Sequence, residues 1–129
     1  MTGDPVPPEV VGILGARGEA VSALALRLRA VVFEALPDAI EQPDASAGLV
    51  GYALGPRLAD SVCVIAPQRA WVNLGLYRAV DLPDPAGLLV GTGKLHRHVK
   101  VRSVEDLGSP PLRALLEEAV TRGRVRRGG

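Results

Sequence analysis

The chain lacks several features that mark familiar classes of protein. It contains a single cysteine, which excludes an internal disulfide framework. Its only aromatic residues are Phe33, Tyr52, Trp71 and Tyr77, so leucine, valine and alanine must build the core. Neither sign of charge dominates, because 15 basic residues stand against 14 acidic ones. Sequence-independent binding of nucleic acid needs many phosphate contacts, so we expect no nucleic-acid partner.

Long apolar runs are also missing. No run approaches the ~20 residues that cross a bilayer, so we expect no membrane contact. The start, from Met1 to Glu9, holds acidic residues and three prolines where a secretory signal would have a basic segment before an apolar one. We therefore predict a cytoplasmic protein. A chain of 129 residues, 47% of them hydrophobic, is long enough for one domain with its own core.

Residues 19–36 have the apolar spacing of an amphipathic helix. One arc of this helix consists of Val21, Leu24, Ala25, Leu28, Val32 and Ala35. Leu26 and Phe33 form a second apolar pair, which the N-terminal segment or a second subunit can cover. Pro37 ends the helix.

The two ends of the chain differ in character. Residues 1–18 are expected to form a flexible arm with a short helical piece at 9–14. Near the other end, Ser109 is a good N-cap for a closing helix, and Gly123 is a fitting stop. The basic residues 124–129 then form a mobile tail that can touch nucleic acid or an acidic partner, although a solubilising role is the simpler interpretation.

Between the helices, four segments have the composition of strands, namely 49–54, 61–66, 70–78 and 95–102. The second is apolar on both faces and is expected at the centre of a sheet; it contains Cys63, whose thiol we expect to be buried. An acidic connection (37–47) precedes the strands, and a longer loop (79–94) interrupts them. The prediction is a single α+β domain over residues 19–123, with an antiparallel sheet of about four strands packed against an N-terminal and a C-terminal helix.

Alternation along the last two strands predicts a polar surface. We expect the apolar alternate residues of these two strands to face the helices, namely Val72, Leu74, Leu76, Val99 and Val101. The opposite face then carries Trp71, Asn73, Tyr77, His96, His98, Lys100 and Arg102. Rings, amides and positive charges together suit an anionic or nucleotide-like ligand. A solvated sheet face, or one covered by a second subunit, fits the same pattern.

The turn Gly91-Thr92-Gly93-Lys94 can also hold an anion, because its glycines free backbone amides beside a lysine. It is not a phosphate-binding loop of the nucleotide-hydrolase type, since Leu95 replaces the required serine or threonine. A tight structural turn is the competing interpretation.

Two histidines suggest a metal site. His96 and His98, two apart on a predicted strand, can reach one metal ion together with a carboxylate such as Asp84 or Glu41. Without an identified third ligand, exposed histidines on a strand explain the same residues.

Five segments resemble the YdhG-like family of proteins of unknown function: 72–77, 82–85, 87–89, 91–94 and 97–100. The resemblance extends more weakly over residues 19–123, including Pro37 and Glu41. It implies a compact α+β fold with a central antiparallel sheet. Some relatives are described as frataxin-like iron chaperones, which implies iron as a bound metal. A frataxin-type site would use an acidic ridge on the first helix, where this chain offers only Glu19 and Glu34.

Three functional hypotheses follow. The leading one is a non-enzymatic binding module for a small anion, a nucleotide-like ligand or a protein partner, with a homodimer as one form. Its binding residues would be Trp71, Asn73, Tyr77, Gly91, Thr92, Gly93, Lys94, Arg97, His98 and Lys100. The second is an iron-binding chaperone of the frataxin-like kind. The third is a small enzyme that uses Lys94, His98 and a carboxylate, Glu41 or Asp84, for acid–base chemistry.

Overall fold

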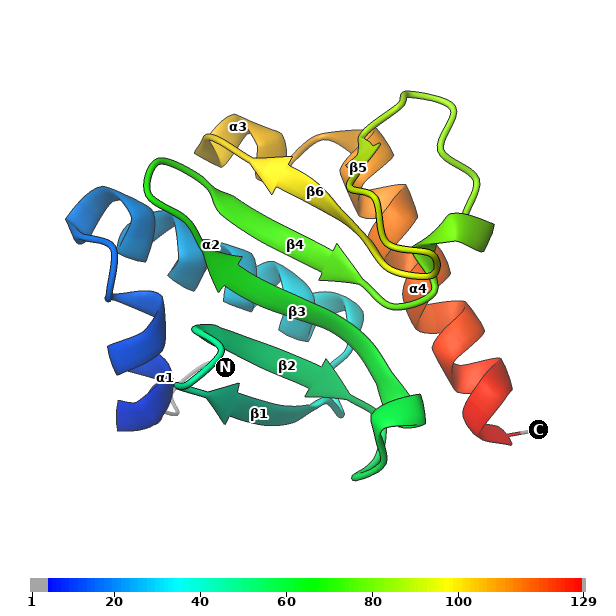
Figure 1. Ribbon diagram of the computed structural model, residues 1–129, viewed down its shortest axis with the longest axis horizontal. Coiled ribbons are helices and arrows are strands. Elements are labelled where there is room, and N and C mark those ends of the chain that lie inside the picture. The colour runs from blue at the N-terminus through cyan, green and yellow to red at the C-terminus, as the bar shows by residue number, and fades with distance from the viewer. Residues whose placement is uncertain (1–4, 129) are drawn as a thin grey trace.

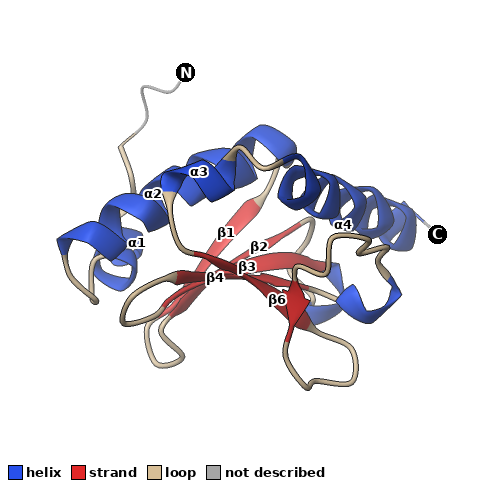
Figure 2. Ribbon diagram, turned by 90° about the horizontal axis from the view of Figure 1, so that it is seen from above, coloured by secondary structure: helices blue, strands red, loops and turns tan. Residues whose placement is uncertain are grey.

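The fold has two layers, a twisted sheet and a set of helices on one of its faces (Figure 1 and Figure 2). The computed structural model describes residues 5–128, and within them the chain forms six strands and four α-helices. The helices are α1 (Pro8–Leu14), α2 (Glu19–Ala35), α3 (Val104–Leu107) and α4 (Pro110–Gly128). The strands are β1 (Ile40–Asp44), β2 (Leu49–Ala53), β3 (Ser61–Pro67), β4 (Val72–Leu76), β5 (Leu89–Val90) and β6 (Arg97–Val101). The expected α+β class and single domain are confirmed.

All neighbouring strands are antiparallel, in the order β1-β2-β3-β4-β6-β5. The four predicted strands correspond to β2, β3, β4 and β6. The prediction of about four strands was too low because it left out the two edges, β1 inside the predicted connection 37–47 and β5 inside the predicted loop 79–94. β1 was not predicted because it contains Pro43 and two acids, which are uncommon in strands. An edge strand tolerates them, because one side of its backbone needs no partner.

The N-terminal helices pack on the sheet and on each other. The predicted face of α2 is confirmed, since Val21, Leu24, Ala25, Leu28 and Val32 are buried, while Ala35 is only partly covered. In α1, Val10, Ile13 and Leu14 join the same core. α1 corresponds to the short helical piece expected at 9–14 within the predicted arm 1–18. Residues 1–4 lie outside the part that the structure describes.

α4 continues through the segment expected to be a mobile tail. The helix reaches Gly128, although Gly123 was expected to stop it. Gly123 is buried, and a Cβ atom there would lie 3.0 Å from Cγ2 of Val62, so this glycine allows the helix to pack closely on β3. The predicted tail 124–129 is thus helical as far as residue 128.

The arginines of this last stretch bind acceptors on the same chain. The pairs are Arg122 with Glu118, Arg124 with Asp38 and Arg127 with Asp60, and Arg126 reaches the carbonyl of Ser61 and the ring of Tyr77. Asp60 is the only charged side chain in residues 5–128 that is fully buried. Apart from Glu118, these partners come from segments far away in the sequence, so composition alone made this stretch look like a tail. None of the helices in the described range is long and apolar enough to cross a bilayer.

Candidate functional site

The helices leave one face of the sheet uncovered (Figure 2). The predicted alternation is confirmed: Val72, Leu74, Leu76, Val99 and Val101 are buried beneath the helices. Strand register defines what lies on the other side, which we call the open face: Gln42, Asp44, Leu49, Gly51, Val64, Ala66, Asn73, Gly75, His98 and Lys100, with Trp71 beside them. Sequence reasoning thus assigned β4 and β6 to the correct faces.

Trp71, Asn73 and Lys100 form a compact cluster at one end of the open face. Asn73 and Lys100 are cross-strand partners. The indole N–H of Trp71 donates a hydrogen bond of 2.7 Å to Oδ1 of Asn73, and Nζ of Lys100 lies 4.7 Å from the centre of the indole ring. The lysine therefore occupies one face of the ring and fixes a positive charge there.

Tyr77 does not belong to this cluster, which corrects the predicted composite site. It follows the last residue of β4, roughly 20 Å along the strand from Trp71. Its ring stacks on His96 at 4.5 Å, and the guanidinium of Arg126 on α4 lies 5.2 Å from its centre. Tyr77 and His96 therefore connect the end of the sheet to α4, and no single small ligand contacts both Trp71 and Tyr77.

The turn Gly91–Lys94 connects β5 to the start of β6, and this start lies beside the end of β4 (Figure 1). Tyr77 follows that end of β4, so the turn and Tyr77 lie at the same end of the sheet, away from Trp71. Thr92 and Lys94 are exposed. Gly91 has a φ of +121°, and a Cβ atom on Gly93 would lie 2.9 Å from the carbonyl oxygen of His96, so both glycines are needed to close the hairpin between β5 and β6. These contacts favour the structural interpretation of the turn.

Arg97 is also separated from the rest of the predicted set. It pairs with Leu76 across β4 and β6, and Leu76 is buried on the side of the helices. Its guanidinium donates to the carbonyl of His96. Arg97 and His98 therefore lie on opposite faces of β6, as consecutive strand residues must. Burial and, to a smaller extent, the positive charge of Lys100 lower the pKa of His98.

Three of the four candidate metal ligands are engaged elsewhere. Glu41 binds Arg29 and Tyr52, Asp84 accepts the backbone N–H groups of Leu88 and Leu89, and Nδ1 of His96 accepts the N–H of Arg78. Glu41 lies on β1, four strands away from the two histidines. Across residues 5–128 there is no group of three His, Cys, Asp or Glu side chains that could hold a metal ion. The same separation keeps Glu41 away from Lys94 and His98, so these residues do not form an acid–base set.

Glu41 instead anchors a polar network beneath the helices. Nε and Nη2 of Arg29 donate to its two oxygens at 2.7 and 2.9 Å, and the hydroxyl of Tyr52 donates at 2.8 Å. The Phe33 ring meets Tyr52 edge-on at 5.6 Å and lies under the guanidinium at 5.0 Å. Burial and the bond to Glu41 raise the pKa of Tyr52, so its hydroxyl remains a donor. Phe33, one of the second apolar pair on α2, is therefore packed within the chain.

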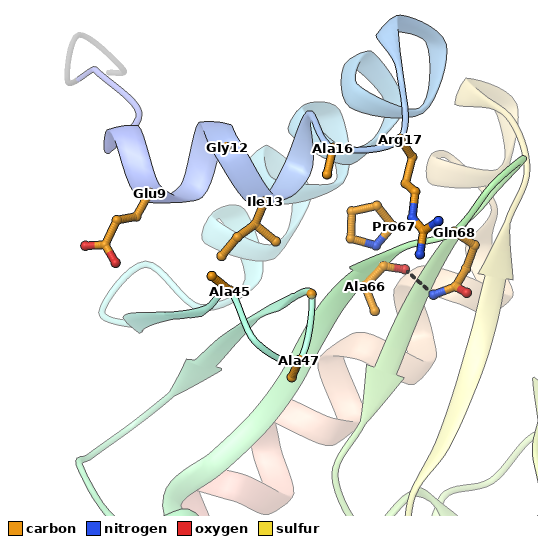
Figure 3. A pocket seen from close by; sticks show the side chains of 11 residues that line it. Glu9, Gly12, Ile13, Ala16, Arg17, Ala45, Ala47, Ala66, Pro67 and Gln68 are labelled. Carbon is orange, nitrogen blue, oxygen red and sulfur yellow. Dashed lines mark hydrogen bonds between the residues drawn. The ribbon is translucent and has the colours of Figure 1, made fainter.

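Sequence reasoning missed a depression of about 600 Å³ between α1 and two turns of the sheet (Figure 3). Its walls are Glu9, Gly12, Ile13, Ala16 and Arg17 from α1 and its C-terminal end, Ala45, Ala47 and Gly48 from the β1–β2 turn, and Ala66, Pro67 and Gln68 from the end of β3. Helical spacing places the α1 residues on one face. Most of these side chains are small and carry no chemical motif, so no sequence signal identified the cavity.

Local hydrogen bonds shape both turns. Asp44 accepts the hydroxyl of Ser46 and the N–H of Ala47, and these bonds, that of Ser46 foremost, lower its pKa. Gly48 then adopts a φ of +69°, which favours glycine. On the other side, the N–H of Gln68 donates to the carbonyl of Trp71. The cavity and the Trp71 cluster therefore adjoin across the β3–β4 turn.

The charges around this cavity are unevenly compensated. In Figure 3, Arg17 and Gln68 lie on one side and Glu9 lies at the far end of α1. Among the residues that the structure describes, Arg17 and Arg69 form no ion pair. The arginines of α4, in contrast, bind the chain's own acceptors. The free guanidinium of Arg17 is therefore available to an anion.

A second depression, of about 440 Å³, lies between α4 and the loop before β5. Its walls are Pro83, Asp84, Pro85, Ala86, Pro110, Pro111, Ala114, Leu115 and Glu118. Both acids are engaged, Asp84 with backbone amides and Glu118 with Arg122. This cavity is mainly apolar and offers no free charge.

No protein-family model, curated protein or solved structure matches this chain. The resemblance to the YdhG-like family therefore stays a prediction.

Proposed function

We propose that this chain is a non-enzymatic binding module for a small organic anion, which occupies the depression between α1 and the turns of the sheet. The observation that carries the proposal is Arg17, a guanidinium without an ion pair at the rim of a cavity whose walls are polar and apolar in nearly equal parts. A guanidinium binds carboxylates and phosphates through paired N–H donors. The ligand class is thus a carboxylate or phosphate ester with a small apolar body.

The size and lining of the cavity support this class. About 600 Å³ falls within the range of small-molecule sites, which combine apolar walls with a few polar groups. Ile13, Pro67 and the alanines supply the apolar contacts, and Gln68 is held in place by a hydrogen bond from its amide to the carbonyl of Ala66. Because the cavity is only partly enclosed, we expect modest affinity.

Catalysis is not part of the proposal. Among residues 5–128, the cavity is lined by two ionisable side chains, Glu9 and Arg17, and by no histidine, cysteine or serine. Acid–base or nucleophilic chemistry needs a titrating group or an activated nucleophile beside the ligand. We also do not propose iron binding, since Glu41 and Asp84 have other partners.

The test is a thermal-shift screen against small carboxylates, phosphorylated metabolites and nucleotides, followed by calorimetric titration of each hit. A ligand at 100 times its Kd stabilises the native state by ~2.7 kcal/mol, which is a rise of roughly 10 °C in Tm for a domain of this size. We expect Arg17→Gln to remove this shift. Arg27→Gln is the matched control, because Arg27 is an exposed arginine of α2 outside the cavity.

Two results would contradict the proposal. One is a hit whose Kd is the same for wild type and Arg17→Gln. The other is a hit lost on Trp71→Ala or Lys100→Ala but kept by Arg17→Gln, which would move the anion to the cluster on the open face.

A further inference from the structure

The open face has a charge pattern that runs across the strands. One register row reads Asp44, Leu49, Ala66, Asn73 and Lys100 from β1 to β6. The row thus begins with a carboxylate, passes over two apolar side chains and the amide of Asn73, and ends with an ammonium. Four strand spacings of ~4.8 Å place its charged ends roughly 19 Å apart, too far for an ion pair within the chain.

The neighbouring row, which we call the flat row, has glycine at two of its five positions. It reads Gln42, Gly51, Val64, Gly75 and His98. A Cβ atom on Gly75 would lie 2.7 Å from Cγ2 of Val64, so the chain itself explains that glycine. A Cβ atom on Gly51 would have only ordinary contacts, at 3.6 Å or more, and nothing within the chain requires glycine there. A glycine inside a strand often marks a site where another chain approaches closely.

We propose that the open face is the interface of a symmetric homodimer, in which two sheets pack face to face about a two-fold axis parallel to β3. Such an axis reverses the order of the strands but keeps their ends together. Asp44 of one copy then faces Lys100 of the other, and this pair occurs twice. In the flat row Gly51 faces the second copy's Gly75, and the two copies of Val64 meet at the axis.

The pattern is self-complementary, and this favours a second copy over an unrelated partner. A row with the same charge at both ends would place like charges together under this symmetry, whereas the observed row places opposite charges together at both ends. Trp71 lies beside the row, held by Asn73 and Lys100, and tryptophan is enriched at the centres of protein interfaces.

The size of the face sets the expected affinity. Five strands of about five residues project an area of roughly 24 by 17 Å, or ~400 Å². Standard interfaces bury ~800 Å² per partner, so we expect a weak dimer that dissociates in the micromolar range. This proposal concerns the open face and does not depend on whether the cavity beside α1 binds an anion.

The test is sedimentation equilibrium of wild type, Asp44→Lys, Lys100→Glu and an equimolar mixture of the two variants. Wild type should approach twice its monomer mass of 13.5 kDa at high concentration. Each variant alone places two like-charge pairs in the interface, so association should weaken at least tenfold. In the mixture, the lysine introduced at position 44 of one variant faces the glutamate introduced at position 100 of the other, and the native Lys100 faces the native Asp44. The heterodimer should therefore return to within about threefold of wild type.

Control variants separate this effect from changes in the monomer. Lys94→Glu and Glu117→Lys make the same charge changes at exposed positions outside the open face, and we expect wild-type association. Ser46→Ala removes only the hydroxyl bond from Ser46 to Asp44 and keeps the bond from the N–H of Ala47, and its association should also be unchanged.

Each remaining outcome overturns the proposal. Wild type that stays monomeric up to about 1 mM has no such interface. Dimers that are indifferent to both charge reversals use another surface. A mixture that associates no better than its weaker component shows that Asp44 and Lys100 do not meet between copies, and this comparison stays informative even if one variant is less stable than wild type.

Discussion

Replacing Glu41 by glutamine should destabilise the fold strongly, even though Glu41 lies on an edge strand. Its carboxylate accepts two hydrogen bonds from Arg29 and one from the hydroxyl of Tyr52. The side chains of Arg29 and Glu41 are only 19% and 11% exposed, and Tyr52 is almost fully buried. Water therefore cannot easily replace a lost partner. Glu41→Gln keeps the shape of the side chain but removes the charge and leaves at least one donor without an acceptor.

The magnitude follows from the burial of the network. Removing one member of a buried ion pair costs about 3–5 kcal/mol, and an unsatisfied buried hydroxyl costs about 1–3 kcal/mol. Because the pair retains some exposure, we expect a loss of about 3 kcal/mol in the free energy of unfolding. An unfolding entropy of ~2.1 cal/mol/K per residue gives roughly 0.27 kcal/mol/K for this chain. The expected decrease in Tm is therefore about 11 °C.

Urea unfolding and calorimetry of matched variants measure this loss. Glu34→Gln is the control, since Glu34 on α2 also pairs with an arginine, Arg113, but that pair is 67% and 39% exposed and should be worth less than ~1 kcal/mol. Arg29→Met combined with Glu41→Gln should cost at least ~1 kcal/mol less than the sum of the single changes, because the two side chains are coupled. A Glu41→Gln variant within ~0.5 kcal/mol of wild type would refute the reasoning.

Two further predictions concern buried groups. Burial raises the pKa of the Cys63 thiol to about 12, so Ellman's reagent at pH 8 should label native protein only as fast as it unfolds, and complete labelling within seconds would show an accessible thiol. Hydrogen bonds from the Arg57 side chain lower the pKa of Asp60, and burial opposes this effect. The N–H of Arg57 and the side chain of Arg127 lower the pKa further. Its contribution to stability is then present above the unfolded pKa of ~3.9 and is lost as pH falls through the folded value. Urea unfolding between pH 2 and 6 should therefore show a flatter acid dependence for Asp60→Asn, and parallel curves would contradict this assignment.

The local pattern of apolar residues was sufficient to predict the central part of the fold. The apolar arc of α2 and the alternation in β4 and β6 repeat at the periods of a helix and a strand, and burial follows those periods directly. The limits of β2 and β3 were also close to the structure, because short apolar runs between turn residues describe central strands well. The α+β class follows from the order of these elements.

The edges of the fold were not predictable in this way. β1 contains a proline and acids, and it forms a strand only because β2 offers it a hydrogen-bonding partner. The basic stretch after Gly123 is helical because its arginines are bound within the chain. They form ion pairs with Asp38 and Asp60 and a cation–π contact with the ring of Tyr77. In both cases the stabilising partner is distant in sequence, so local composition indicates a loop or a tail.

For the candidate sites too, some features follow from local sequence and others from tertiary packing. The sequence alone determined which residues share a face of a strand, and it correctly placed Trp71, Asn73 and Lys100 together. Only the tertiary structure decided that Tyr77 and the Gly91–Lys94 turn lie at the opposite end of the sheet. It also brought Arg17 to a cavity and set Asp44 and Lys100 at the two sides of one face. Side-chain periodicity is a local property of the backbone, whereas the distance between elements depends on how the whole chain packs.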